Sequence, residues 1–144
     1  ISQFSVSHEK SRLQLDRIHD FLSNQAYWCL GIPKAVVEQA LKHSLCFGLY
    51  ENKLGIQIGF ARVVTDQATF AWLCDIYVER EFRGKGLSKM LMSEMMKHPS
   101  LKKLRRMCLT TKDGHFLYEK FGFEITKTPN YWMEIKNNEI YRKG

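Results

Sequence analysis

The segment from Phe70 to Leu91 constrains the fold of this chain more than any other. An apolar strand pattern, FAWLCDIYV, leads through a charged turn into Arg83-Gly84-Lys85-Gly86-Leu87-Ser88, which opens a helix. The two glycines let the backbone approach a ligand closely, and the first turn of a helix carries amide N–H groups without intrahelical partners. The helix dipole adds positive charge to these amides, so such a turn binds anions and phosphate above all. The segment therefore predicts a site for a phosphate-bearing ligand between a strand and a helix.

The rest of the chain is typical of one folded domain. Its 144 residues are 44% hydrophobic and 26% charged, and no repeat, low-complexity tract or Pro/Gly/Ser-rich linker divides them. We therefore expect a single domain over residues 1–144. Helical and strand patterns alternate along it, which predicts an α/β or α+β domain around one mixed, twisted sheet of about six to seven strands with about four flanking helices.

Hydrophobic periodicity and turn residues give the expected elements. The expected strands are Phe4–Ser7, Cys46–Tyr50, Gly55–Val64, Thr69–Val78, Met107–Thr110, Phe123–Thr126 and Trp132–Ile135. The expected helices are Leu13–Leu22, Lys34–Lys42, Leu87–His98 and His115–Phe121.

Charge and cysteine usage narrow the functional classes. The formal net charge is +7, but basic residues are scattered except around Lys102–Arg106, which is typical of a solvated strand entry. Nucleic-acid binding is kept only as a weaker alternative. The four cysteines lack CxxC or metal-ligand spacing, so we expect no metal site, and free thiols predict a cytoplasmic protein. No apolar run is long enough to span a bilayer, so no membrane partner is expected.

Spacing separates the known glycine-rich phosphate loops. A P-loop needs GxxxxGK followed by Ser or Thr, which this chain lacks. A dinucleotide-binding turn needs GxGxxG, but Lys89 stands where the third glycine belongs, and the acidic residue expected about 20 positions later is missing. Neither class of nucleotide site fits.

A third type of loop fits better. Arg83, Gly86 and Ser88 resemble the pattern of Arg or Gln, two residues, Gly, one residue, then Gly or Ala that forms the acyl-CoA pyrophosphate loop of the GCN5-related N-acetyltransferase (GNAT) family. An overlapping register would use Glu81, Gly84 and Gly86. Downstream, HFLYEKFGF at 115–123 resembles the family's LYEKxGF signature, although Thr111 stands where an Asn is often seen. The resemblance spans roughly residues 47–135.

The resemblance implies transfer of an acetyl group from acetyl-CoA to an amine. Tyr118 would protonate the departing CoA thiolate, because a phenol with a pKa near 10 is a suitable acid for a thiolate. The strand before the loop would carry a bulge, pair with pantetheine and polarise the thioester oxygen through its backbone. The implied cofactor contacts are Ile76, Tyr77, Val78, Arg83, Gly84, Lys85, Gly86, Leu87, Ser88 and Tyr118.

Asp75 is unusual as a carboxylate within an apolar strand. Strict alternation places it with Leu73 and Tyr77 on one face, and the even-numbered residues 70–78 on the other. It is a candidate general base or amine anchor, and the alternative is a structural residue held by Arg62. Tyr27, Trp28 and Trp72, together with Asp75, are candidates for the acceptor pocket, with core packing as the alternative for the aromatic residues.

The chemistry and the partners stay partly open at this stage. The chain shows no Ser/His/Asp or Cys/His pattern, so we expect direct attack by the amine without an acyl-enzyme. The amine could belong to a small metabolite, an amino acid, an antibiotic or a peptide N-terminus. A non-catalytic acyl-CoA-binding regulatory module is the alternative function, and edge strands near the C-terminus leave a homodimer open.

Overall fold

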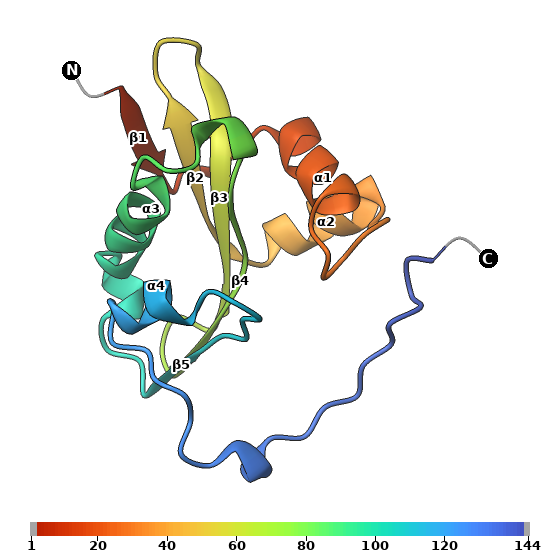
Figure 1. Cartoon of the computed structure of the whole chain (residues 1–144), viewed down its shortest axis with the longest axis vertical. Coiled ribbons are helices and arrows are strands. Elements are labelled where there is room, and N and C mark those ends of the chain that lie inside the picture. Colours follow the sequence, from red (N-terminus) through yellow and green to blue (C-terminus); the bar gives the residue numbers. More distant parts are fainter. Residues whose placement is uncertain (1–2, 143–144) are drawn as a thin grey trace.

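The computed structural model describes residues 3–142 and contains one five-stranded sheet with helices on both faces (Figure 1). The strands are β1 (Phe4–Ser7), β2 (Leu45–Glu51), β3 (Ile56–Thr65), β4 (Phe70–Val78) and β5 (Arg106–Cys108). The α-helices are α1 (Leu15–Asn24), α2 (Lys34–Lys42), α3 (Leu87–Met96) and α4 (His115–Glu119). The prediction of a mixed sheet with four flanking helices in an α+β fold is confirmed.

The sheet order follows the sequence, β1-β2-β3-β4-β5. The first four strands pair antiparallel, and β5 pairs parallel to β4. A parallel neighbour requires a crossover connection, and α3 supplies it. Asp66 holds the turn between β3 and β4 by accepting hydrogen bonds from the backbone N–H groups of Ala68 and Thr69 at 2.9 and 2.8 Å.

Each face of the sheet has its own apolar core. On one face, Leu91, Met92 and Met95 of α3 are fully buried against the strands. On the other, Ile18 of α1 and Val37 of α2 are buried against the opposite side chains of the same strands. Figure 1 shows α3 and α4 on one side of the sheet and α1 and α2 on the other. Two covered faces explain why β4 reads as a nearly continuous apolar run.

The expected strict alternation along β4 is wrong. Leu73 packs in the α3 core, whereas Tyr77, which should share its face, packs in the α1–α2 core. The cause is a β-bulge: the β3–β4 register shifts between Phe60 and Arg62, and Asp75 opposite has φ of 54°. One extra residue on β4 reverses the face of every later side chain. The bulge that the family resemblance implied is thus present at Asp75.

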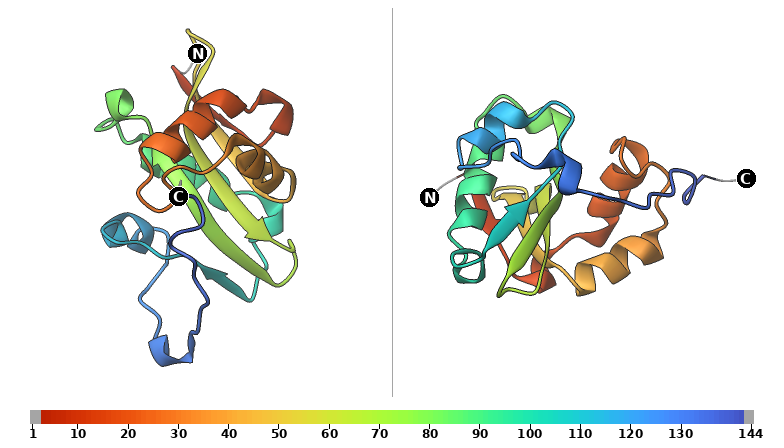
Figure 2. Two further views of the ribbon diagram at one scale, coloured as in Figure 1. Left: turned by 90° about the vertical axis from the view of Figure 1, so that its right-hand side faces the viewer. Right: turned by 90° about the horizontal axis from the view of Figure 1, so that it is seen from below.

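The two strands expected after α4 are also wrong for this chain, so the sheet has five strands rather than six or seven. Within residues 3–142, neither Phe123–Thr126 nor Trp132–Ile135 joins a strand ladder. Residues 123–142 instead form an irregular segment with one 3-10 turn at Pro129–Tyr131. This segment, called the arm below, leaves α4 and runs toward α1 and α2 (Figure 2). A strand needs a paired neighbour, and no described residue pairs with the outer edge of β5.

In the described part of the chain, no helix combines the length and the apolar character needed to cross a membrane.

Candidate active site

The sheet opens between β4 and β5. Their pairing ends at Trp72 and Cys108, whereas β4 continues to Val78. Glu79 N donates to Ile58 O at 2.7 Å, and hydrogen-bonded pairs alternate along an antiparallel ladder. The backbone groups of Val78 and the carbonyl of Ile76 therefore point away from β3 into the opening, whereas the backbone of Tyr77 faces β3. Of the three residues expected to offer backbone groups to pantetheine, two are placed to do so.

The glycine-rich loop lies at the end of β4 and leads into α3. Gly84 and Gly86 have φ of 80° and 73°, a left-handed backbone conformation that residues with a Cβ rarely adopt. A Cβ at either position would meet no atom within 4 Å, so open space lies before both residues. Gly86 is the N-cap of α3, and no side chain caps the helix. The first-turn amides, including those of Leu87 and Ser88, thus have no intrahelical partner and face an open approach.

The basic side chains of this loop have different roles. Arg83 Nε donates to Val78 O at 2.8 Å, which ties the loop to the end of β4. Lys85 Nζ lies 5.9 Å from the ring centre of Phe4 and 5.8 Å from that of Phe82. These contacts hold Arg83 and Lys85 beside the loop as positive charge, while the backbone amides form its open surface.

Tyr118 lies on α4, opposite the end of β5. Gly114 permits a close approach, because a Cβ there would lie 3.2 Å from Tyr118 Cε2 and 2.9 Å from Thr111 Oγ1. Thr111, at the position where the resemblance led us to expect Asn, accepts a hydrogen bond from Gly114 N at 2.8 Å. Burial raises the pKa of Tyr118, and the nearby Tyr27 and Asp113 raise it further. The phenol therefore keeps its proton at neutral pH.

Asp75 is held from two sides. Its Oδ2 accepts from Arg62 Nε at 2.8 Å, and its Oδ1 accepts from Trp28 Nε1 at 2.8 Å. The side chains of Arg62 and Asp75 are only 19% and 11% exposed, so the ion pair is largely shielded from water. These contacts agree with the structural alternative considered for Asp75, because both carboxylate oxygens already have donors.

The aromatic residues expected at the acceptor pocket separate into two places. Tyr27 and Trp28 contact each other edge-to-face at 5.1 Å in the loop between α1 and α2, and are 59% and 45% exposed. Lys112 follows β5, and its Nζ lies 5.4 Å from the ring centre of Tyr27. The loop between α1 and α2 therefore reaches across the opening. Trp72 lies where the opening begins, and its ring centre is 6.1 Å from that of Trp132 in the arm.

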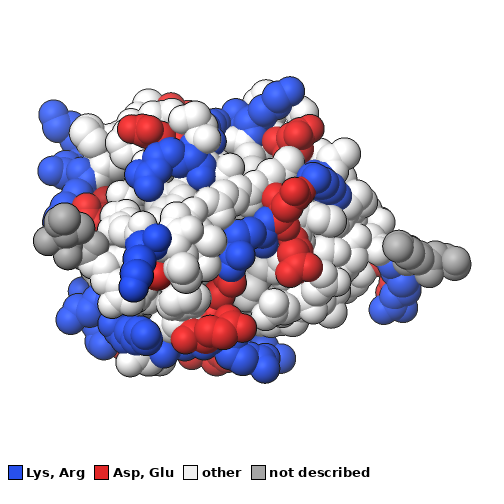
Figure 3. All heavy atoms as spheres, turned by 90° about the horizontal axis from the view of Figure 1, so that it is seen from above, with Lys and Arg blue, Asp and Glu red and all other residues white. Residues whose placement is uncertain are grey.

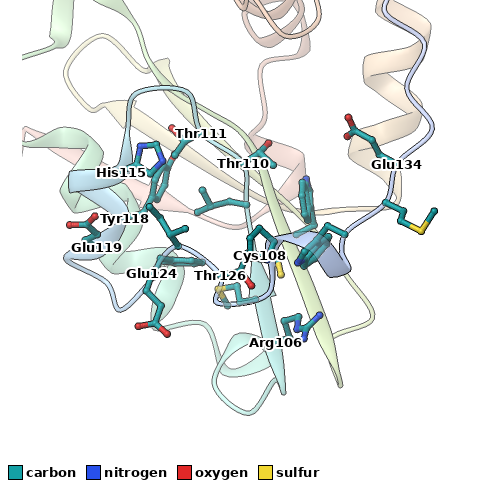
Figure 4. A pocket seen from close by; sticks show the side chains of 18 residues that line it. Arg106, Cys108, Thr110, Thr111, His115, Tyr118, Glu119, Glu124, Thr126 and Glu134 are labelled. Carbon is teal, nitrogen blue, oxygen red and sulfur yellow. The ribbon is translucent and has the colours of Figure 1, made fainter.

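A cavity of about 880 Å³ lies beside β5, between α4 and the arm, and neither the glycine-rich loop nor the part of β4 beyond Trp72 lines it. Figure 4 shows β5 as its floor, with Tyr118 and His115 of α4 on one side and Glu134 of the arm on the other. Trp72 also lines it. Tyr118 therefore borders a space large enough for a small-molecule substrate.

Cys29 and Cys74 lie close to Asp75, whereas Cys108 lines the cavity beside Tyr118. Burial raises the pKa of Cys29 and of Cys74 to about 12, so both stay protonated at neutral pH. Between residues 3 and 142, no group of three or more His, Cys, Asp or Glu side chains is arranged to hold a metal ion. Seen from above, acidic side chains lie among the basic ones (Figure 3), so the positive charge on that face is broken up.

Comparison with known proteins identifies the fold and the reaction class. The family profile described as the acetyltransferase (GNAT) domain matches residues 42–125, more than half of the chain. The chain belongs to this family. A Gibberella zeae protein assigned to the acetyltransferases is 30% identical over 142 residues, covering 84% of this chain and 79% of that protein. GNAT membership makes acyl transfer the reaction class of this chain.

Solved structures agree with the GNAT assignment. A crystal structure from Xanthomonas campestris assigned to the GNAT family is 43% identical, covers 99% of both chains and has a TM-score of 0.94. Glucosamine-6-phosphate N-acetyltransferase from Arabidopsis thaliana has a TM-score of 0.66 at 15% identity, over 94% of this chain and 98% of that one, which shows the shared fold alone.

Sequence reasoning missed several residues at the opening of this GNAT domain. Lys112 and Asp113 contribute charge beside Tyr27 and Tyr118, and Gly114 provides the room for Tyr118. Their place four to six residues before the tyrosine was the available signal. Trp132 was expected within a strand, and only the tertiary structure places it beside Trp72.

Proposed function

We propose that this GNAT domain transfers an acetyl group from acetyl-CoA to an amine by direct attack. The observation that carries the proposal is the opening between β4 and β5, which has the Gly84–Gly86 loop at its head and Tyr118 at its side. Acetyl-CoA supplies an activated thioester, whose carbonyl carbon the amine attacks. Its products would be an N-acetylated amine and free CoA.

The residues present fit an acyl-CoA. The open space before Gly84 and Gly86 suits a bulky diphosphate, and the unpartnered amides of Leu87 and Ser88 suit its charge. The carbonyl of Ile76 and the N–H of Val78, which face the opening, suit the amides of pantetheine, which would add to β4 as an extra strand. Arg83 would fix the loop through Val78 O, and Lys85 would add positive charge nearby.

Tyr118 would act as the general acid. Burial keeps its phenol protonated, so it holds the proton that a departing thiolate needs. The proton that the amine loses on forming the amide balances the one that Tyr118 gives up. Partial burial raises the pKa of the thiols of Cys29, Cys74 and Cys108, which is consistent with direct attack without an acyl-enzyme.

Asp75 would position the acceptor pocket. Since Trp28 and Arg62 occupy its two oxygens, we assign it to holding the loop that carries Tyr27 and Trp28 over the opening. Tyr27 and Trp28 would then contact the acceptor amine through their exposed rings, and Trp72 would do so where it lines the cavity. The occupied oxygens argue against Asp75 as the base.

Thermal shift followed by a thiol-release assay tests the proposal. Acetyl-CoA at about 100 times its Kd should stabilise the chain by about 2.7 kcal/mol. Thiol release with a panel of amines should then identify acceptors. Stabilisation without thiol release for any amine would support the alternative, a non-catalytic acyl-CoA-binding module. The absence of both stabilisation and thiol release would refute both functions. The free cysteines suit a cytoplasmic protein, which fractionation of the source cells would test.

A further inference from the structure

Two opposite charges stand side by side where the loop between α1 and α2 reaches across the opening. Lys112 and Asp113 are both exposed, and neither forms an ion pair with the other or with any further described residue. By contrast, the shielded carboxylate of Asp75 is neutralised by Arg62. An adjacent cation and anion without partners are complementary to a ligand that carries both charges.

Both charges lie beside the groups assigned to the transfer. Lys112 Nζ lies 5.4 Å from the ring centre of Tyr27. The carboxylate of Asp113 raises the pKa of Tyr118, so it lies near the phenol. The bend that carries both charged residues is held by the hydrogen bond that Thr111 Oγ1 accepts at 2.8 Å. A ligand that spans the two charges therefore lies next to the proposed acid.

The cavity that Tyr118 lines is mainly apolar. Its volume of about 880 Å³ lies in the range of pockets that bind small molecules. Large apolar side chains from β4, β5 and the arm line it: Trp72, Met107, Leu109, Phe123 and Trp132. Such walls favour a flat apolar group over a polar one, because a polar group would lose its water without gaining a partner.

The charged residues of the cavity leave its centre free of charge. Glu119, Glu124 and Glu134 are exposed, and Figure 4 shows their carboxylates at the rim, directed away from the centre. The guanidinium of Arg106 lies 5.6 Å from the ring centre of Trp132, so it covers that ring. An extended cationic chain, such as a polyamine, would find no carboxylate along the centre of the cavity.

The two charges and the aromatic end of the cavity are a short distance apart. Cys108 is level with Trp72 in the β4–β5 ladder, and the four residues from Cys108 to Lys112 span at most about 14 Å. Tyr118 lines the space between them. A ligand with two charges at one end and a ring at the other fits along this path.

We propose that the acceptor of the acetyl transfer is a free α-amino acid with an aromatic side chain. Lys112 binds its α-carboxylate, Asp113 binds its α-ammonium group, and its ring lies in the cavity against Trp72 and Trp132. This inference rests on the proposed acetyl transfer and names the class of its acceptor.

The step balances with this acceptor. The ammonium loses a proton, its nitrogen bonds to the thioester carbon, and the C–S bond breaks. Of the two protons that the nitrogen loses in all, one replaces the proton that Tyr118 gives to the thiolate, and the other passes to water. The products are the N-acetylated amino acid and CoA.

Rates of thiol release with acetyl-CoA and a matched panel of amines test the inference. L-Phenylalanine carries the amine, the carboxylate and the ring. L-Alanine lacks the ring, and L-phenylalaninamide replaces the carboxylate with an amide, as a peptide N-terminus does. We expect kcat/KM for L-phenylalanine to exceed both others about tenfold or more.

Each result of this panel decides between classes of acceptor. An equal or higher kcat/KM for L-phenylalaninamide would indicate a peptide N-terminus or a neutral amine and would overturn the inference. An equal or higher value for L-alanine would overturn the role of the cavity. Thiol release with other amines but not with L-phenylalanine would overturn the inference and leave acetyl transfer standing, whereas no release with any amine would refute both.

Single variants assign the preference to its residues. Lys112→Gln should abolish the preference for L-phenylalanine over L-phenylalaninamide, and Trp132→Leu should reduce the preference over L-alanine. Both are ratios of two substrates on one protein, so a partly unfolded sample does not alter them. Lys53→Gln, at an exposed lysine of the β2–β3 turn, is the matched control and should keep both preferences. A Lys112→Gln variant that keeps the wild-type preference would remove Lys112 from carboxylate binding and overturn the inference.

Discussion

Gly86 combines a left-handed backbone with open space at the head of the candidate CoA site. Its φ is 73°, and a Cβ there would meet nothing within 4 Å. In Gly86→Ala, the loss of stability should therefore come from backbone strain and not from a clash. Holding an L-residue in this region costs about 1–2 kcal/mol. For a chain of this size, that lowers Tm by about 2–8 °C.

The same Cβ would stand where we place the diphosphate. We expect Gly86→Ala to raise the Kd for acetyl-CoA by about tenfold, or about 1.4 kcal/mol. At a concentration of about 100 times the wild-type Kd, acetyl-CoA should stabilise the wild type by about 2.7 kcal/mol and the variant by about 1.4 kcal/mol. Titration calorimetry measures the affinity, and thermal unfolding with and without acetyl-CoA measures the stabilisation.

Gly55 offers a matched control. Its φ is 66° and its Cβ position is equally open, but it lies in the β2–β3 turn. Gly55→Ala should lose about the same stability and bind acetyl-CoA as the wild type does. Equal acetyl-CoA affinity in both variants would refute the assignment of the loop to the diphosphate. A Gly55→Ala variant as stable as the wild type would refute the strain argument.

Three further substitutions test the roles of single side chains. Tyr118→Phe should lower kcat about 100- to 10,000-fold with an unchanged Kd for acetyl-CoA, and equal kcat would remove Tyr118 from the mechanism. Since burial raises the pKa of Tyr118 above the ordinary value of a phenol, the acid form persists in the wild type, and kcat should not fall through loss of this proton in the neutral and mildly alkaline range of a pH–rate profile. Asp75→Asn keeps an acceptor for Trp28 but loses the ion pair with Arg62, so KM for the amine should rise with little change in kcat; a collapse of kcat alone would indicate a general base instead. Tyr77→Phe should raise the free energy of unfolding by about 1 kcal/mol in urea denaturation, because its buried hydroxyl has no hydrogen-bond partner among the described residues; a loss of stability would contradict this.

Local patterns predicted much of this fold. Helix Lys34–Lys42 and strand Phe4–Ser7 have the expected bounds, and the start of α3 at Leu87 was set by the glycines before it. These features depend on residues close in sequence, through turn chemistry and hydrophobic period. The GNAT resemblance was carried by two such short motifs, and the family match confirms it.

The arrangement of the candidate site depends on contacts between residues that are distant in sequence, which spacing alone does not predict. Asp75 receives hydrogen bonds from Trp28, on another loop, and from Arg62, on the neighbouring strand. The bulge at Asp75 moves every later side chain of β4 to the opposite face of the sheet, because one additional residue shifts an alternation of period two. The sequence of the strand does not reveal the bulge, because apolar residues stand at both odd and even positions on either side of Asp75.

The sequence by itself determined the glycine turn before α3, the tyrosine signature on α4 and the apolar stretches that form the sheet. Only the tertiary structure decided where β4 parts from β5, which face each β4 side chain takes, and that the apolar arm leaves its own sheet. The physical reason is that a strand is completed by a ladder partner distant in sequence, whereas turns and helix starts are completed by their neighbours.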